Sequence, residues 1–143
     1  MSLRRHAVAT ATAVLLTACF HGAPQDATLG DGLADAAAEA GDGGAITLAD
    51  HTEVDAVEVV VVPAGTDAEV TADALGLRPP RQAVAPVAEG EAALVAFRTA
   101  DDGLVWSTID AGQLEIQLDG SYGADQTVIV TETADGFVLS EEQ

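Results

Sequence analysis

The spacing of apolar and polar residues predicts a β-rich fold in the second half of the chain. Residues 59–62 are four successive valines, so both faces of a strand there are apolar. Such a run is typical of a strand in the middle of a sheet that is covered on each side. Residues 113–118 instead alternate leucine or isoleucine with polar residues. That alternation predicts a strand with one buried and one solvent-exposed face.

Further strands are predicted wherever short apolar runs end in Asp- and Gly-containing turns, because these residues suit turn conformations. The last five strands form a predicted antiparallel meander, with a longer loop over 119–126. The expected strands cover 45–48, 54–62, 92–98, 104–109, 113–118, 127–133 and 137–140.

One helix is predicted between the early strands and the meander. Thr66 and Glu69 have the spacing of a capping box, and the apolar stripe that follows predicts a helix over 67–75. Residues 82–87 are expected to form an edge strand interrupted by Pro86. The predicted fold class is therefore a β-rich α+β fold, with a mostly antiparallel sheet, a C-terminal meander and one short helix. An all-β sandwich is the alternative if the helix is absent.

Residues 19–44 have the composition of an acidic linker. They are rich in Ala, Asp and Gly, and Leu29 and Leu33 are the only sizeable apolar anchors in the middle of the segment. A segment of this kind is expected to be disordered, because it buries too little surface to offset its ordering entropy. The folded part is then predicted as a single small domain over 45–143.

The first 19 residues carry an export pattern. Arg4 and Arg5 precede an apolar run of about 12 residues, well below the ~20 needed to span a bilayer as a helix. Leu16-Thr17-Ala18-Cys19 follows, and Cys19 is the one cysteine of the chain. This segment resembles the lipobox of a bacterial lipoprotein signal peptide.

The resemblance implies removal of residues 1–18 and a covalent lipid on Cys19. The mature chain would then be extracytoplasmic and anchored to the cell membrane, since two fatty chains hold a protein stably. Phe20 stands where an Asp would resemble an inner-membrane retention signal. The outer membrane is therefore the expected destination in a host with two membranes.

Charge excludes one class of partner. The chain has no lysine, and after residue 18 three arginines face 24 acidic residues, a net charge of −21. Phosphate backbones repel such a surface, so nucleic-acid binding is excluded. The acidity is explained either by attraction of cations or a basic partner, or by solubility in a saline medium.

Four aspartates are the candidate metal ligands, because a regular meander places their loops at one end of the sheet. Oxygen ligands of this kind suit Ca²⁺. The chain lacks the spacing of a continuous calcium loop, and solvated turn aspartates are the alternative interpretation. The four candidates are Asp101, Asp102, Asp119 and Asp125.

Two other residues are candidates for binding or catalysis. His51 lies among acidic neighbours and is a possible base or metal ligand, or an exposed loop histidine. Tyr122 lies in a predicted loop and is the best candidate for a binding hot spot. The sequence favours a non-catalytic domain that binds or assists an envelope partner or solute. An extracytoplasmic hydrolytic enzyme and a cation-binding surface protein are the alternatives.

Overall fold

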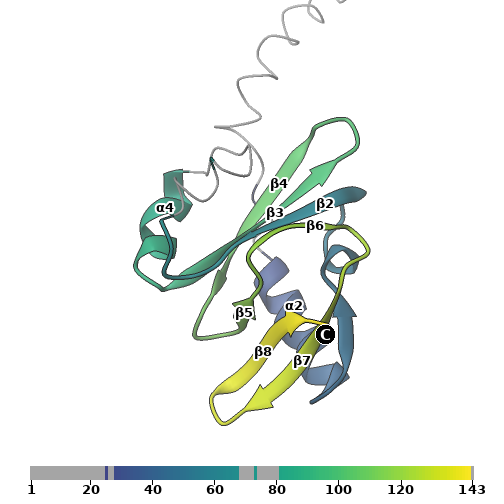
Figure 1. Cartoon of the computed structure of the whole chain (residues 1–143), viewed down its shortest axis with the longest axis vertical. Coiled ribbons are helices and arrows are strands. Elements are labelled where there is room, and N and C mark those ends of the chain that lie inside the picture. Colours follow the sequence, from purple (N-terminus) through teal and green to yellow (C-terminus); the bar gives the residue numbers. More distant parts are fainter. Residues whose placement is uncertain (1–24, 26–27, 68–72, 74–80, 143) are drawn as a thin grey trace, which may run out of the picture.

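The computed structural model describes residues 25, 28–67, 73 and 81–142 (Figure 1). Its helices are α2 (Leu29–Ala40), α4 (Arg81–Ala88) and the short 3-10 helix η1 (Leu48–His51). The strands are β1 (Ala45–Thr47), β2 (Ala56–Val62), β3 (Ala92–Thr99), β4 (Leu104–Asp110), β5 (Glu115–Gln117), β6 (Gly120–Gly123), β7 (Thr127–Thr133) and β8 (Gly136–Glu141).

The strands form two four-stranded sheets. Sheet 1 has the order β4-β3-β2-β6, and sheet 2 has the order β1-β7-β8-β5. All strand pairs are antiparallel except β5 and β8, which are parallel. With two helices and two mostly antiparallel sheets, the predicted β-rich α+β class is confirmed.

Strand β2 explains how the two cores are divided. It lies between β3 and β6, and its four valines at 59–62 are at most 1 % exposed. Val59 and Val61 enter the main core, while Val60 and Val62 point to the opposite face and enter a second core. The prediction of a strand covered on both sides is therefore confirmed.

The main core lies between the sheets and helix α2. Its largest members are fully buried and come from α2, from both sheets and from the segment between β4 and β6. These residues are Leu29, Leu33, Phe97, Ile109, Leu114, Leu118 and Leu139. Leu114, Ile116 and Leu118 are all buried, which confirms the alternation predicted for that segment.

Helix α2 corrects the prediction of a disordered linker over 19–44 for residues 28–44, the part that the structure describes without a gap. Leu29, Leu33 and Ala37 recur every four residues on one helix face, and each is 0 % exposed in the main core. Gln113 Nε2 donates a hydrogen bond of 2.7 Å to Asp31 Oδ1, which ties the helix to the loop after β4. The prediction was wrong because tertiary packing, and not the helix's own composition, stabilises this segment.

Helix α4 corrects a second prediction, that of an edge strand over 82–87. Ala83 and Val87, four residues apart, lie on one face of α4 and are buried in the second core beside Trp106. Pro86 suggested an interrupted strand, yet it lies inside the helix. Helix α4 contacts β3 and so covers the outer face of sheet 1 (Figure 1).

The predicted meander is interrupted by a change of sheet. The hairpins β3–β4 and β7–β8 form as expected, but after β4 the chain crosses to sheet 2, where β5 pairs with β8. It then returns to sheet 1 as β6, which lies inside the predicted loop over 119–126 and pairs with β2. Strand β6 was missed because Gly-Ser-Tyr-Gly has little strand propensity.

Two predictions concern residues outside the described part of the chain. The helix over 67–75 falls there apart from Asp67 and Asp73, and so do Leu16, Thr17, Ala18 and Cys19. Thr66, just before that helix, donates its hydroxyl to the Pro63 carbonyl at 2.8 Å. Over the described ranges, the structure has no helix that is both long and apolar enough to cross a membrane.

Candidate functional site

Tyr122 is a structural residue in the arrangement that the structure shows. It lies in strand β6 opposite Val59, is half-buried, and packs against the main core, so its placement in a loop was wrong. Its hydroxyl accepts a hydrogen bond from the Asp119 N–H at 3.0 Å and lies 3.2 Å from the Asp119 carbonyl, to which it donates. The Tyr122 hydroxyl is thus already hydrogen-bonded to the backbone three residues earlier in the chain.

The four candidate metal ligands are divided between the two ends of sheet 1. Asp101 and Asp102 form the β3–β4 turn, and Asp125 follows β6 at the same end, because Glu58 of β2 pairs with both Arg98 and Gly123. Asp119 precedes β6 and therefore lies at the other end. Strands β3 and β6 are separated by β2, so roughly 10 Å separates their ends.

No group of three or more His, Cys, Asp or Glu side chains in the described residues is arranged to hold a metal ion. The expectation that a regular meander gathers the four aspartates was wrong, because Asp119 is at the far end of β6. Calcium binding elsewhere on this acidic surface stays a prediction.

The Asp101 side chain is hydrogen-bonded within the β3–β4 turn in which it lies. The Thr99 hydroxyl donates to Asp101 Oδ1 and accepts from the Gly103 N–H at 2.9 Å. The hydrogen bond from Thr99, followed by backbone hydrogen bonds at Asp101 and Gly103, holds the pKa of Asp101 below its ordinary value of 3.8. Asp102 follows with a φ of +64°, in the left-handed region that Asp tolerates better than bulkier residues.

A hollow lies beside β1. It has a volume of about 570 Å³, within the usual range for ligand sites. We call it the β1 groove. Its walls come from the last turns of α2, from β1, from η1 and from the start of β7. The lining residues are Ala36, Glu39, Ala40, Ala45, Ile46, Thr47, Asp50, His51 and Thr127.

The β1 groove follows an unpaired strand edge. Among the described strands, β1 is at one edge of sheet 2 and pairs with β7 alone. Gly44 accepts a hydrogen bond from the Val130 N–H at 2.8 Å, so residues 44 and 46 face β7 in the alternating antiparallel ladder. The N–H and C=O groups of Ala45 and the N–H of Thr47 therefore point away from β7, toward the outer edge of the sheet. Thr47 is the N-cap of η1, so its C=O belongs to the first turn of that helix.

The rim of the groove is acidic. Glu39 and Asp50 are exposed, and His51 beside them is half-buried. Within the part of the chain that the structure describes, the only ion pair joins Arg98 to Glu58, at 3.3 Å across sheet 1. No described base therefore pairs with Glu39 or Asp50.

The sequence identified only part of this site. The acidic residues around His51 predict part of it, but Glu39 falls in the predicted linker and β1 corresponds to a short predicted strand. Of the other acids near His51, neither Glu53 nor Asp55 lines the groove. Only the packing of α2 against β1 brings Glu39 to the same place.

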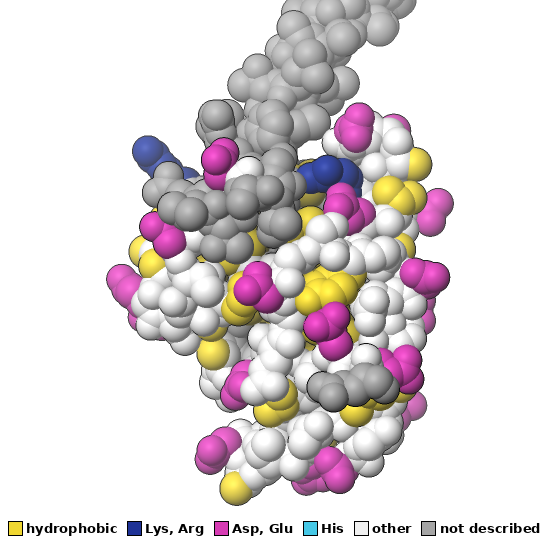
Figure 2. Space-filling view, in the orientation of Figure 1, with side chains coloured by type: hydrophobic (Ala, Val, Ile, Leu, Met, Phe, Trp, Pro, Cys, Tyr) yellow, Lys and Arg dark blue, Asp and Glu magenta, His cyan; other side chains and the backbone are white. Residues whose placement is uncertain are grey.

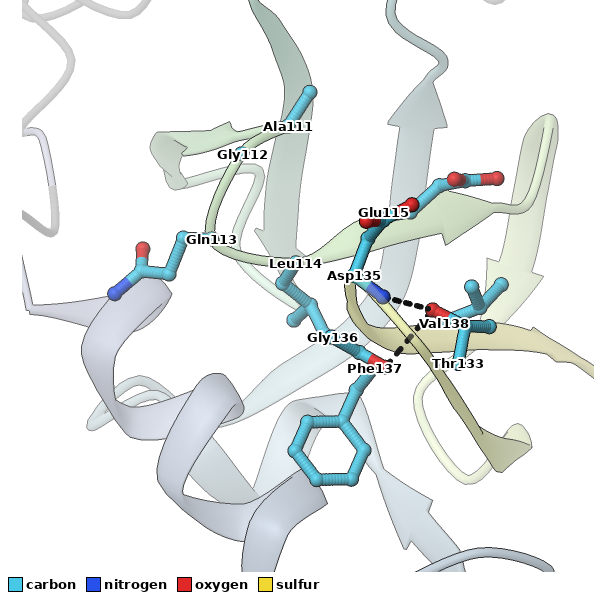
Figure 3. A pocket seen from close by; sticks show the side chains of 10 residues that line it. All are labelled: Ala111, Gly112, Gln113, Leu114, Glu115, Thr133, Asp135, Gly136, Phe137 and Val138. Atoms are coloured by element: carbon cyan, nitrogen blue, oxygen red, sulfur yellow. Dashed lines mark hydrogen bonds between the residues drawn. The ribbon is translucent and has the colours of Figure 1, made fainter.

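A second hollow, between β5 and the β7–β8 turn, is too small for a ligand (Figure 3). Its volume is about 50 Å³, which suits one or two water molecules. The Thr133 hydroxyl is occupied there, since it donates to the Gly136 carbonyl at 3.1 Å and accepts from the Asp135 N–H at 3.3 Å.

Acidic side chains are spread over the whole visible face of the molecule and form no single cluster (Figure 2).

No protein-family model matches this chain, and no curated protein or solved structure gives a significant match.

Proposed function

We propose that this protein is an extracytoplasmic lipoprotein, anchored to the cell membrane through a lipid on Cys19, whose acidic domain binds an envelope partner or solute without catalysis. The observation that carries the proposal is the sequence Leu16-Thr17-Ala18-Cys19 after a charge-free apolar run and two arginines. The outer membrane is the proposed location in a host with two membranes.

The surface charge supports a lipid anchor over peripheral attachment. An anionic lipid surface repels a chain with 24 acidic residues, so the protein surface itself supplies no membrane affinity. Two acyl chains supply it instead, at about 0.8 kcal/mol for each buried methylene group.

The fold supports a domain held close to the membrane. Because Gln25, six residues after Cys19, already pairs with Trp106, the connecting chain reaches roughly 20 Å at most. The longer linker predicted from sequence would have allowed a much larger separation. A domain this near the bilayer is placed to bind a membrane-bound or envelope partner.

The anchor is tested by changing Cys19 to Ser in the natively exported chain. We expect the wild type to incorporate labelled fatty acid and to stay with membranes after a carbonate wash, and Cys19→Ser to do neither. Ala18→Ser keeps a small residue before the cysteine and is the control that should retain the lipid. Membrane retention of Cys19→Ser without lipid would contradict the proposed anchor.

The binding role is tested by in-cell crosslinking of the exported protein, followed by mass spectrometry. We expect one dominant envelope or secreted partner that is captured by the wild type. Turnover of a substrate by the purified chain, with no captured partner, would contradict a non-catalytic role.

A further inference from the structure

We infer that the β1 groove binds an extended polypeptide segment carrying lysine or arginine side chains, which pairs with β1 as a fifth strand of sheet 2. This inference rests on the proposed binding function and names its surface and the chemistry of its partner. It does not require the anchor.

The main-chain groups on the outer edge of β1 are the first reason to expect an added strand. The outward N–H and C=O of Ala45 and the N–H of Thr47 are the groups with which an added strand would pair, and main-chain hydrogen bonds of this kind give affinity. The β4 edge of sheet 1 differs, because Trp106 already pairs there with Gln25. The groove beside β1 also offers apolar surface for alternate side chains, from Ala36, Ala40 and Ile46.

The acidic side chains of the groove are the second reason, and they favour a segment with cationic side chains. Glu39 comes from α2 and Asp50 from η1, and both carboxylates line the groove beside β1. Cationic side chains on an extended segment lying along β1 would be attracted to both. A second copy of this chain would bring the same acids to the groove and is disfavoured.

The experiment uses the full mature chain in detergent micelles and a fluorescent probe peptide, acetyl-(Lys-Val)3-amide. Binding is followed by fluorescence anisotropy at physiological ionic strength, where the Debye length is about 8 Å and distant charges are screened. Comparison peptides are an N-methylated version, which keeps the charge but loses half of its backbone donors, and acetyl-(Glu-Val)3-amide. Spermidine is the competitor that tests a small-cation site.

We expect the Lys-Val peptide to bind at least tenfold more tightly than either comparison peptide, and spermidine not to displace it. On the protein, Glu39→Gln with Asp50→Asn should weaken binding roughly three- to tenfold, as expected for two solvent-screened charge pairs. The matched control, Glu89→Gln with Asp135→Asn, removes two exposed acids elsewhere and should leave binding unchanged.

A charge-reversal pair at one position separates steric from electrostatic effects. Ala45 is exposed, so both Ala45→Arg and Ala45→Glu should fold. Ala45→Arg should abolish probe binding, while Ala45→Glu should retain it. Equal binding of the N-methylated peptide, displacement by spermidine, an equal loss in the control variant, or no binding at all would each overturn the inference. The mass of the same preparation reports the lipid on Cys19, so failure of the groove and failure of the anchor are distinguished.

Discussion

Sheet 1 and sheet 2 each have four strands but are buried differently. Sheet 1 is covered on both faces, by the main core on one side and by α4 and the second core on the other. Sheet 2 contributes Val128, Val130 and Leu139 to the main core, and the intervening residues of β7 and β8 are exposed or half-buried. Sheet 1 is therefore covered on both faces, whereas the outer face of sheet 2 is partly open to solvent.

The largest expected effect tests the helix that joins the two sheets. Leu33→Ala removes a side chain that is 0 % exposed in the main core, and we expect it to lower the free energy of unfolding by about 2–5 kcal/mol. Asp35→Ala, on the exposed face of the same helix, should change it by less than about 0.5 kcal/mol. Urea denaturation measures both. Equal stability of Leu33→Ala and wild type would mean that α2 is not part of the folded domain.

A matched pair of substitutions compares the outer faces of the sheets directly. Val60→Thr places a hydroxyl in the second core and should cost about 1–3 kcal/mol. Ile129→Thr makes a similar change on the half-buried outer face of sheet 2 and should cost less than about 1 kcal/mol. Equal losses in urea denaturation would show that both outer faces are covered, and the contrast between the sheets would fail.

Substitutions in the two hairpin turns are expected to lower stability by similar amounts, because each turn depends on one residue with positive φ. Asp102 has φ +64° and Gly136 has φ +140°. Asp102→Val and Gly136→Ala should each cost about 1–2 kcal/mol through backbone strain, whereas Asp102→Gly should be nearly neutral. Thermal unfolding of the three variants measures this. A harmless Gly136→Ala would mean that the β7–β8 turn is not held in this conformation.

The smallest expected effect distinguishes the hairpins by pH. The depressed pKa of Asp101 stabilises the folded state above the ordinary value of 3.8, and this contribution is lost as the pH falls through the folded-state pKa. Thr99→Val should therefore differ more from wild type at neutral pH than at pH 3. Thr133→Val is the control in the other hairpin, since its hydroxyl bonds the Gly136 carbonyl and no carboxylate. A loss for Thr99→Val that is the same at both pH values would contradict this role.

The sequence correctly predicts the elements whose own apolar pattern indicates which residues are buried. The valines at 59–62 predicted a covered strand, and the hairpins β3–β4 and β7–β8 followed from apolar runs and Asp/Gly turns. It failed where long-range packing decides the structure. The Ala- and Gly-rich α2 is helical because Leu29 and Leu33 pack into the main core. The parallel pairing of β5 with β8 has no local signal in the sequence.

The candidate site was less predictable than the fold, because it depends on how three successive elements, α2, β1 and η1, pack together with the start of β7. Glu39, Thr47 and Asp50 meet only after α2 packs beside β1. An aromatic residue in a predicted loop made Tyr122 the expected hot spot, yet its hydroxyl bonds the backbone of Asp119. An isolated residue type was thus a poor guide here, and a free strand edge was invisible without the sheet order.

The account's central claim, that the binding edge belongs to the less covered sheet, is tested most directly by amide hydrogen exchange of the full chain with and without the Lys-Val peptide. We predict that the Ala45 and Thr47 amides, which point outward from β1, exchange more slowly when the peptide is present. The amides of β6, at the edge of sheet 1, should be unaffected. Protection on β6 with none at Ala45 and Thr47 would contradict the claim.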